Sequence, residues 1–226
     1  MRGLMLVMLL LLGGALCAQK EYKWPDLLNT AKDADYLSAQ ERAVIFEMNK
    51  ARSNPKRYAL EVILPMKKRF TDSENSRIYY NSDSMRIMTQ EGTAAIDECV
   101  KEMMGTAPMG MLLPSKGMSR AALDHTKDQS RTGKTGHTGK DGSTPWKRME
   151  RYGRWLVTCG ENIDYGNKDA QAIVVSLLVD DGVPSRGHRR SILNGAFKVA
   201  GVAIGSHSKY RDMCTINFAG GYEEKK

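Results

Sequence analysis

The 226-residue sequence predicts a single α+β domain in which one sheet is covered by helices. Apolar residues recur at helical spacing through the first part of the chain, and β-rich stretches gather near its end. Apolar residues make up 41% and charged residues 27% of the chain, which excludes a disordered chain and a polytopic membrane protein. The formal charge of +8 is spread without a run of five like charges, so the sequence does not indicate nucleic-acid binding.

The first 18 residues are typical of a secretory signal peptide. Arg2 precedes an unbroken apolar run from Leu4 to Leu12, and small residues lead to Ala18. This stretch is short for a membrane-spanning helix, which needs about 20 apolar residues, so an uncleaved anchor is the weaker interpretation. We expect cleavage after Ala18, a secreted, periplasmic or extracellular location, and no transmembrane segment in the mature chain. The expected organisation is a signal peptide at residues 1–18, an N-terminal arm at 19–36, the domain at 37–222 and a charged tail at 223–226.

The individual elements follow from cap and breaker signals. Ser38 and Glu41 form a capping-box signature for a helix that Asn54-Pro55 ends. The remaining elements are expected in this order: an irregular insertion at residues 56–90, helices at 92–104 and 119–130, a glycine-rich loop at 132–143, a short helix at 146–152, a strand at 156–165, a helix at 170–178 capped by Asn167, and strands at 198–204 and 213–219.

Three cysteines remain once Cys17 leaves with the signal peptide. Export to an oxidising compartment favours one disulfide. Cys99 follows a helical apolar pattern and is expected to be buried, whereas Cys159 and Cys214 lie in strand-like stretches. We therefore predict a Cys159–Cys214 bridge, with no bridge at all as the alternative.

Candidate chemistry is confined to polar residues on turns, because the sequence has no paired CxxC, no H-E-x-x-H and no G-x-S-x-G motif. His137 lies in the glycine-rich loop, Glu161 lies within an apolar strand, and Asp180 and Asp181 end a helix shortly before His188. Two imidazoles and two carboxylates can ligate a divalent cation or share protons in acid–base chemistry. The alternative is that these groups hydrogen-bond one another and hold loops on the sheet.

Several short motifs occur in a characteristic order. Gly160-Glu161-Asn162-Ile163 is followed by an amphipathic helix and then by Gly187-His188-Arg189. Supporting pieces are Asn49-Lys50-Ala51-Arg52, Ala121-Ala122-Leu123-Asp124-His125 and Phe197-Lys198-Val199-Ala200-Gly201-Val202-Ala203. This order resembles the CAP superfamily of cysteine-rich secretory, antigen 5 and pathogenesis-related proteins, in its bacterial SCP-like form. The resemblance covers residues 37–222 and implies an α-β-α sandwich with a central, mainly antiparallel sheet.

The resemblance also implies a cleft with two histidines and two acidic residues. At matching positions these are His137, Glu161, one aspartate of the Asp180/Asp181 pair, and His188. The family pattern and the helical wheel both favour Asp181 over Asp180. His137 and His188 would be the ligands of a metal such as zinc, although the fold requires no cofactor.

Three further features need an interpretation. His125 continues an apolar helical stripe, which predicts a core histidine, or one supporting the cleft, rather than a ligand. Glu161 must be partnered because an unpaired buried charge costs several kcal/mol, and the resemblance implies the imidazoles of His137 and His188 as its partners. A cluster of arginines beside His188 favours a solvated turn over a phosphate or anionic-lipid site: Arg186, Arg189 and Arg190.

Three functions follow as hypotheses. The resemblance favours a secreted, non-catalytic module that binds a ligand or an extracellular partner, with lipid as one candidate. A metal-assisted extracellular hydrolase using the same cleft is the main alternative. A structural envelope protein, in which the cleft serves stability alone, is the third. The lack of a nucleophile–base signature favours a non-enzymatic role.

Overall fold

The computed structural model describes residues 23–70, 77–81 and 86–225, so the expected signal peptide lies outside the described residues. Its centre is a four-stranded sheet in the order β3 (Leu113–Pro114), β5 (Val199–His207), β6 (Arg211–Glu224) and β4 (Gly153–Tyr165). Strand β3 pairs with β5 in parallel, whereas β5–β6 and β6–β4 are antiparallel. The predicted, mainly antiparallel central sheet is confirmed.

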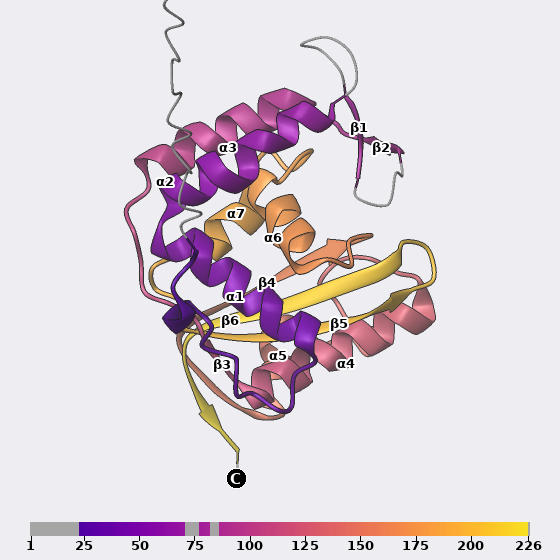
Figure 1. The fold of residues 1–226 in the computed structure, drawn as a ribbon. Coiled ribbons are helices and arrows are strands. Elements are labelled where there is room, and N and C mark those ends of the chain that lie inside the picture. Colours follow the sequence, from indigo (N-terminus) through magenta and orange to yellow (C-terminus); the bar gives the residue numbers. More distant parts are fainter. Residues whose placement is uncertain (1–22, 71–76, 82–85, 226) are drawn as a thin grey trace, which may run out of the picture.

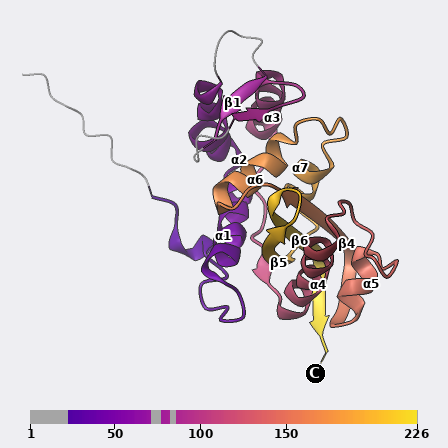
Figure 2. The same ribbon diagram turned by 90° about the vertical axis from the view of Figure 1, so that its right-hand side faces the viewer.

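Helices cover both faces of this sheet (Figure 1). Helices α4 (Lys116–Thr132) and α5 (Pro145–Glu150) pack on one face, and α1 (Ala39–Ser53), α6 (Ala170–Val179) and α7 (Gly187–Ile192) lie on the other. Figure 2 shows these three layers from the side. The structure therefore confirms the α-β-α sandwich.

The core has two parts that match the two faces. The larger cluster joins α1, α3 (Thr93–Gly105) and α6 to the sheet, and the smaller one lies between α4, α5 and the sheet. Gly201 of β5 makes the second contact close, since a Cβ there would collide with the backbone of Met118 and Ser119. This close approach fixes α4, and with it His125, against the sheet.

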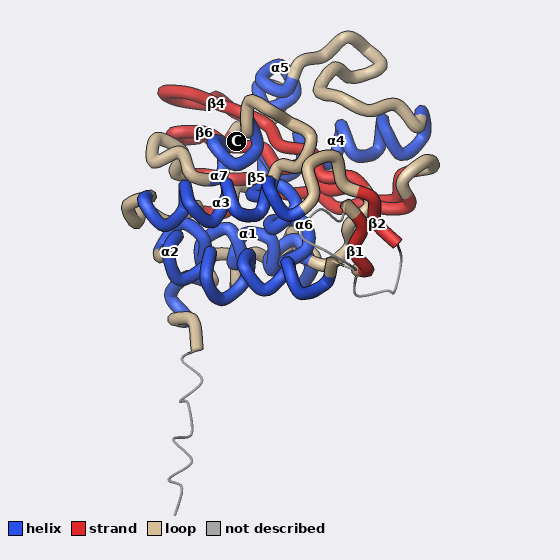
Figure 3. The backbone as a smooth tube through the Cα atoms, turned by 90° about the horizontal axis from the view of Figure 1, so that it is seen from above, coloured by secondary structure: helices blue, strands red, loops and turns tan. Residues whose placement is uncertain are grey.

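Residues 55–69 differ from the predicted irregular insertion. They form α2 (Pro55–Tyr58), a π-helical turn (Ala59–Ile63) and a 3-10 helix (Leu64–Arg69), and Tyr58, Ala59 and Ile63 are buried in the core. After them, β1 (Ile78–Tyr80) and β2 (Arg86–Met88) pair apart from the main sheet, beside the helical layer (Figure 3). The sequence did not predict these helices because none of them is long enough to show a helical repeat of apolar residues.

The packed domain extends beyond its predicted bounds at both ends. The expected N-terminal arm contains a 3-10 helix (Asp26–Leu28), and Leu28 and Ala31 are buried. Asn49 Nδ2 donates to the Leu28 carbonyl at 2.9 Å, so the described part of the arm belongs to the packed domain. At the other end, β6 continues through Glu224, into what was predicted as a charged tail.

The predicted N-cap residue is correct for α1 and wrong for α6. Ser38 and Glu41 form the predicted capping box. The N-cap of α6 is Asp169, which accepts from the Ala172 N–H at 3.0 Å. Asn167, the predicted cap, instead donates to Asp164.

The predicted Cys159–Cys214 disulfide is wrong. Both thiols are free, and Cys99 is free and buried as well. Cys159 lies opposite Ala219 in the β4–β6 ladder, whereas Cys214 lies opposite Asp164. Five residues of strand correspond to about 17 Å, far beyond the Cα separation of about 7 Å that a disulfide spans.

In the described part of the chain, no helix combines the length and the apolar character that crossing a membrane requires.

Candidate functional site

The first histidine–carboxylate pair joins the glycine-rich loop to β4. His137 Nδ1 lies 3.0 Å from Glu161 Oε1. The Glu161 side chain is only 1% exposed, whereas that of His137 is 50% exposed. Because the carboxylate only accepts hydrogen bonds, Nδ1 carries the proton that joins the pair. The ring therefore presents its Nε2 edge away from the strand.

Arg148 of α5 stands behind this pair. Its Nη2 donates to both Glu161 oxygens, at 3.0 and 2.8 Å, and its side chain is 1% exposed. Its Nη1 donates to the carbonyls of His137 and Ser143, at 3.1 and 2.9 Å. One buried guanidinium thus neutralises Glu161 and fastens the loop at two points. Sequence reasoning missed Arg148, since a six-residue helix gives too few turns to reveal a buried face.

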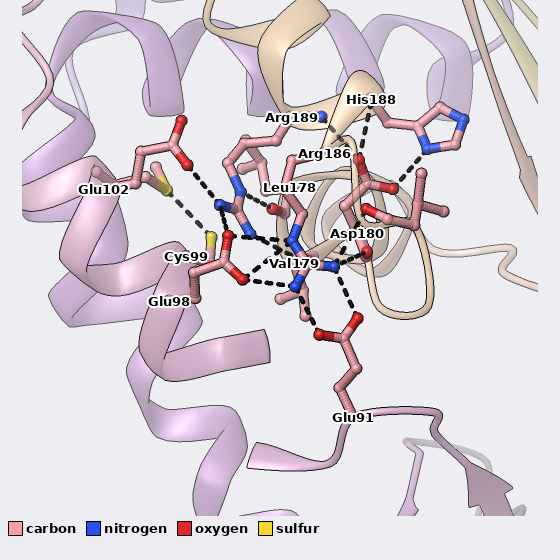
Figure 4. Close-up of polar contacts among 12 residues, drawn as sticks. Glu91, Glu98, Cys99, Glu102, Leu178, Val179, Asp180, Arg186, His188 and Arg189 are labelled. Atoms are coloured by element: carbon pink, nitrogen blue, oxygen red, sulfur yellow. Dashed lines mark hydrogen bonds and ion pairs between the residues drawn. The ribbon is translucent and has the colours of Figure 1, made fainter. Parts of the chain in front are cut away.

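The second pair joins α6 to α7. His188 Nδ1 lies 2.6 Å from Asp180 Oδ1, and the His188 backbone N–H donates to Asp180 Oδ2 at 2.9 Å (Figure 4). Asp180 is buried, while His188 is 25% exposed. It is Asp180, rather than the expected Asp181, that reaches His188. Asp180 ends α6 in the left-handed conformation, with φ of 56°, and this turns its side chain off the helical wheel.

Asp181 instead serves the segment before α3. Its two carboxylate oxygens accept from the backbone N–H groups of Gln90 and Glu91, at 2.7 and 2.8 Å. It therefore ties the α6–α7 turn to the start of α3.

Two of the three arginines beside His188, Arg186 and Arg189, are buried and ion-paired rather than solvated (Figure 4), whereas Arg190 is exposed as the sequence predicted. Arg186 donates to Glu91 and Glu98, and Arg189 donates to Glu98 and Glu102. Hydrogen bonds from Arg186 lower the pKa of Glu91 to about 2 and that of Glu98 below its usual range. These contacts hold α3 against the turn that carries His188.

The two pairs approach β4 from opposite sides. Glu161 faces α5, and its neighbour Asn162 donates from Nδ2 to the His188 carbonyl of α7 at 2.9 Å. Successive side chains of a strand point to opposite faces, so the Glu161 and Asn162 side chains lie on opposite faces of β4. Among the residues described, no group of three or more His, Cys, Asp or Glu side chains is placed to hold a metal ion. The expected residues form two hydrogen-bonded pairs, His137–Glu161 and Asp180–His188.

His125 is a core residue that supports the loop, as the sequence predicted. It is fully buried, and its Nε2 lies 2.8 Å from the Gly136 carbonyl. A carbonyl only accepts, so Nε2 carries the proton and Nδ1 keeps its lone pair. Burial lowers the pKa of His125, which keeps the ring neutral. In the described structure its Nδ1 has no hydrogen-bond partner.

Asp164 is a further buried carboxylate on β4 that the sequence analysis did not identify. Asn167 Nδ2 donates to its two oxygens at 2.9 and 3.0 Å, and no described cation pairs with it. Burial raises the pKa of Asp164 to about 7.

The family model described as "CAP: Cysteine-rich secretory protein family" matches residues 47–218, well over half of the chain. The chain belongs to the CAP family. The expected resemblance is confirmed, and this CAP domain extends in the structure on both sides of the matched residues.

Two solved structures are similar to this CAP domain. One is an extracellular protein containing a SCP domain from Bacillus anthracis, with 24% identity, a TM-score of 0.41 and coverage of 49% of this chain. The match spans only 34% of that longer Bacillus chain. The other is an outer surface protein from Borrelia burgdorferi, with 16% identity, a TM-score of 0.41, and coverage of 57% of this chain and 89% of that one. No curated protein matches the chain.

Proposed function

We propose that this CAP domain is a secreted, non-catalytic module that binds an extracellular ligand or partner. Two observations support the location: the matching family is described as secretory, and the first 18 residues have the composition of an export signal. The proposal of binding rather than catalysis depends on how the two carboxylates are occupied.

The observation that carries the proposal is that each candidate base already has partners. Glu161 accepts two hydrogen bonds from Arg148 and one from His137. Asp180 accepts from the His188 ring and from the first backbone N–H groups of α7. A general base needs an accessible lone pair beside the substrate, and these carboxylates direct theirs into the protein.

The surface groups that remain are the two imidazole edges. With Nδ1 donating to a carboxylate, each ring offers Nε2 to the exterior, and no described protein group hydrogen-bonds to it. Such an arrangement presents a rigidly oriented acceptor to a donor on a ligand. The same arrangement is found behind metal-bound histidines, but a zinc site needs three or four protein ligands and each pair here supplies one nitrogen. The residues present therefore do not fit a zinc centre.

Calorimetric titration with zinc tests this assignment. We expect no zinc binding in the micromolar range, because neither pair completes a ligand set. If zinc does bind and both rings ligate the same ion, His137→Ala and His188→Ala should each weaken zinc binding more than about 10-fold. Tight zinc binding together with metal-dependent hydrolysis of ester or peptide substrates would establish the hydrolase alternative and contradict the proposal.

A reporter fusion tests the location. Residues 1–20 fused to a reporter should carry it out of the cytoplasm, and a matched fusion in which two leucines of the apolar run are replaced by arginine should not. A wild-type fusion that stays wholly inside the cell would contradict secretion.

A further inference from the structure

The turn between α7 and β5 carries the only Asn-Gly pair of the sequence, Asn194-Gly195. Asn194 Oδ1 accepts a hydrogen bond from the Ala196 N–H at 2.9 Å, and the Asn194 carbonyl accepts from the Phe197 N–H at 3.2 Å. The first contact is an Asx-turn, in which the asparagine side chain folds back over the peptide that follows it. The side-chain amide of Asn194 is therefore held over the Gly195 peptide.

Gly195 leaves its backbone nitrogen open to this amide. The residue has no Cβ to shield the nitrogen, and it is exposed, so water can remove the amide proton. In the described part of the chain, no acceptor is bonded to the Gly195 N–H, whereas the N–H groups of Ala196 and Phe197 both donate to Asn194. The Gly195 nitrogen is therefore available as a nucleophile.

The Ala196 N–H supplies the third element of a reaction at this turn. It donates to Asn194 Oδ1, the atom on which negative charge develops when a nucleophile adds to the side-chain amide carbon. A backbone N–H already placed at that oxygen stabilises the developing charge, as in an oxyanion hole. The turn thus brings together a nucleophile, an electrophilic carbon and a stabilising donor.

We propose that Asn194 is a site of spontaneous covalent modification, at which its side-chain amide becomes a carboxylate. The Gly195 nitrogen forms a bond to the Asn194 side-chain carbon, the bond from that carbon to the amide nitrogen breaks, and ammonia leaves with the proton of the Gly195 N–H. Water then opens the resulting cyclic imide by breaking one of its two carbon–nitrogen bonds. Opening at the side-chain carbon gives aspartate, and opening at the main-chain carbon gives isoaspartate.

The modification introduces a negative charge beside the buried side chain of Arg52. The Nη1 group of Arg52 donates to the Asn194 carbonyl at 2.9 Å and to that of Ile192 at 2.7 Å. The other described acceptors of Arg52 are the carbonyls of Gly110 and Phe197, so all of them are neutral. In isoaspartate the main-chain carbon of residue 194 carries the free carboxylate, which replaces a neutral partner of Arg52 with a charged one.

The reaction needs only water, so it proceeds without an enzyme in a protein that stays outside the cell. The charge of the turn after α7 would then change with the age of the molecule. The inference does not depend on the proposed binding function, because it involves neither histidine–carboxylate pair.

Peptide mapping by mass spectrometry tests the proposal on the full chain, kept folded in mildly alkaline buffer. We expect conversion of Asn194 before any other asparagine, with isoaspartate detected by enzymatic methyl transfer to its free carboxylate. Gly195→Ala should slow the conversion at least about 10-fold, which corresponds to a barrier about 1.4 kcal/mol higher, because the added methyl group shields the nitrogen. The fold tolerates this methyl group, since no atom lies within 4 Å of a Cβ built at Gly195 and its φ is not in the left-handed region.

Gly105→Ala is the matched control. A Cβ at Gly105 also has no atom within 4 Å, but this glycine follows a methionine rather than an asparagine. The rate of conversion at Asn194 should therefore be the same in Gly105→Ala as in the parent.

Three results would overturn the proposal. One is an Asn194 that stays intact in the folded chain and reacts only after unfolding in urea, because the turn would then protect the amide. Another is the same rate in Gly195→Ala as in the parent and in Gly105→Ala, which would exclude the Gly195 nitrogen as the nucleophile. The third is conversion to aspartate without any isoaspartate, which would indicate direct hydrolysis of the amide by water.

Discussion

In both histidine–carboxylate pairs the same imidazole nitrogen contacts the acid, but the other partners of the two carboxylates differ. Both rings approach an acid through Nδ1, at 3.0 Å for His137 and 2.6 Å for His188. Glu161 is neutralised by a buried guanidinium, whereas Asp180 is held by backbone N–H groups at the start of α7. One pair thus depends on a full charge and the other on backbone dipoles.

A third carboxylate, Asp164, is buried and has no described cation paired with it. It lies on β4 three residues after Glu161, and its hydrogen-bond donors are neutral groups of Asn167 and Ser176. Its pKa is raised to about 7. Burial raises the pKa of Asp164, which has only neutral donors, whereas Glu161 has the Arg148 guanidinium as its partner.

Removal of Arg148 should have the largest effect. Arg148→Met leaves Glu161 as a buried charge without its cation, and we expect a loss of about 3–5 kcal/mol in the free energy of unfolding. His137→Ala, at the exposed side of the same carboxylate, should cost less than about 1 kcal/mol. Urea unfolding of both variants checks the contrast, and equal losses would show that the charge of Arg148 is not what stabilises this pair.

Removal of Asp180 should have an intermediate effect. Asp180→Ala removes the acceptor of the His188 ring and of the first N–H groups of α7, with an expected cost of about 2–3 kcal/mol. Asp181→Ala removes acceptors only from the Gln90 and Glu91 N–H groups and should cost about 1 kcal/mol. The reverse order in thermal unfolding would restore Asp181 as the partner of His188.

Asp164→Asn should change the pH dependence of stability. The native pKa of about 7 exceeds the unfolded value, so the native state keeps a proton that the unfolded state loses between about pH 4 and pH 7. Stability from this group therefore falls as the pH rises through that window. The variant lacks this loss, so its stability relative to the parent should rise between pH 4 and pH 8. Parallel pH curves for the two proteins would contradict the raised pKa.

Glu91→Gln should have the smallest effect. Arg186 keeps Glu98 as a second carboxylate, and the Glu91 side chain is 33% exposed, so solvent screens its charge. We expect a loss below about 1 kcal/mol. Glu161→Gln is the matched comparison, because in the described structure Arg148 pairs with no other carboxylate. Similar losses for the two variants would remove the distinction between a shared cation and a dedicated one.

The sequence predicted the secondary-structure elements, which have repeating or local patterns, but it did not predict side-chain contacts between residues far apart in the chain. Helix periodicity, the Ser38 capping box and the late strands were correct, as was the burial of Cys99 and His125. A helix of about one turn, such as Pro55–Tyr58, is too short to show a repeating pattern. The partners of Glu161 and Asp180 depend on side-chain direction at a short helix and at a left-handed helix end, which spacing does not encode.

The most direct test of the central account is the tautomer of His137 and His188. Nitrogen NMR at a pH where both rings are neutral should show the proton on Nδ1, facing the carboxylate, and a lone pair on Nε2, facing outward. That result would mean that Glu161 and Asp180 orient the rings toward a ligand. Rings with the proton on Nε2 and a free Nδ1 would contradict the account, because the carboxylates would then have no proton to accept.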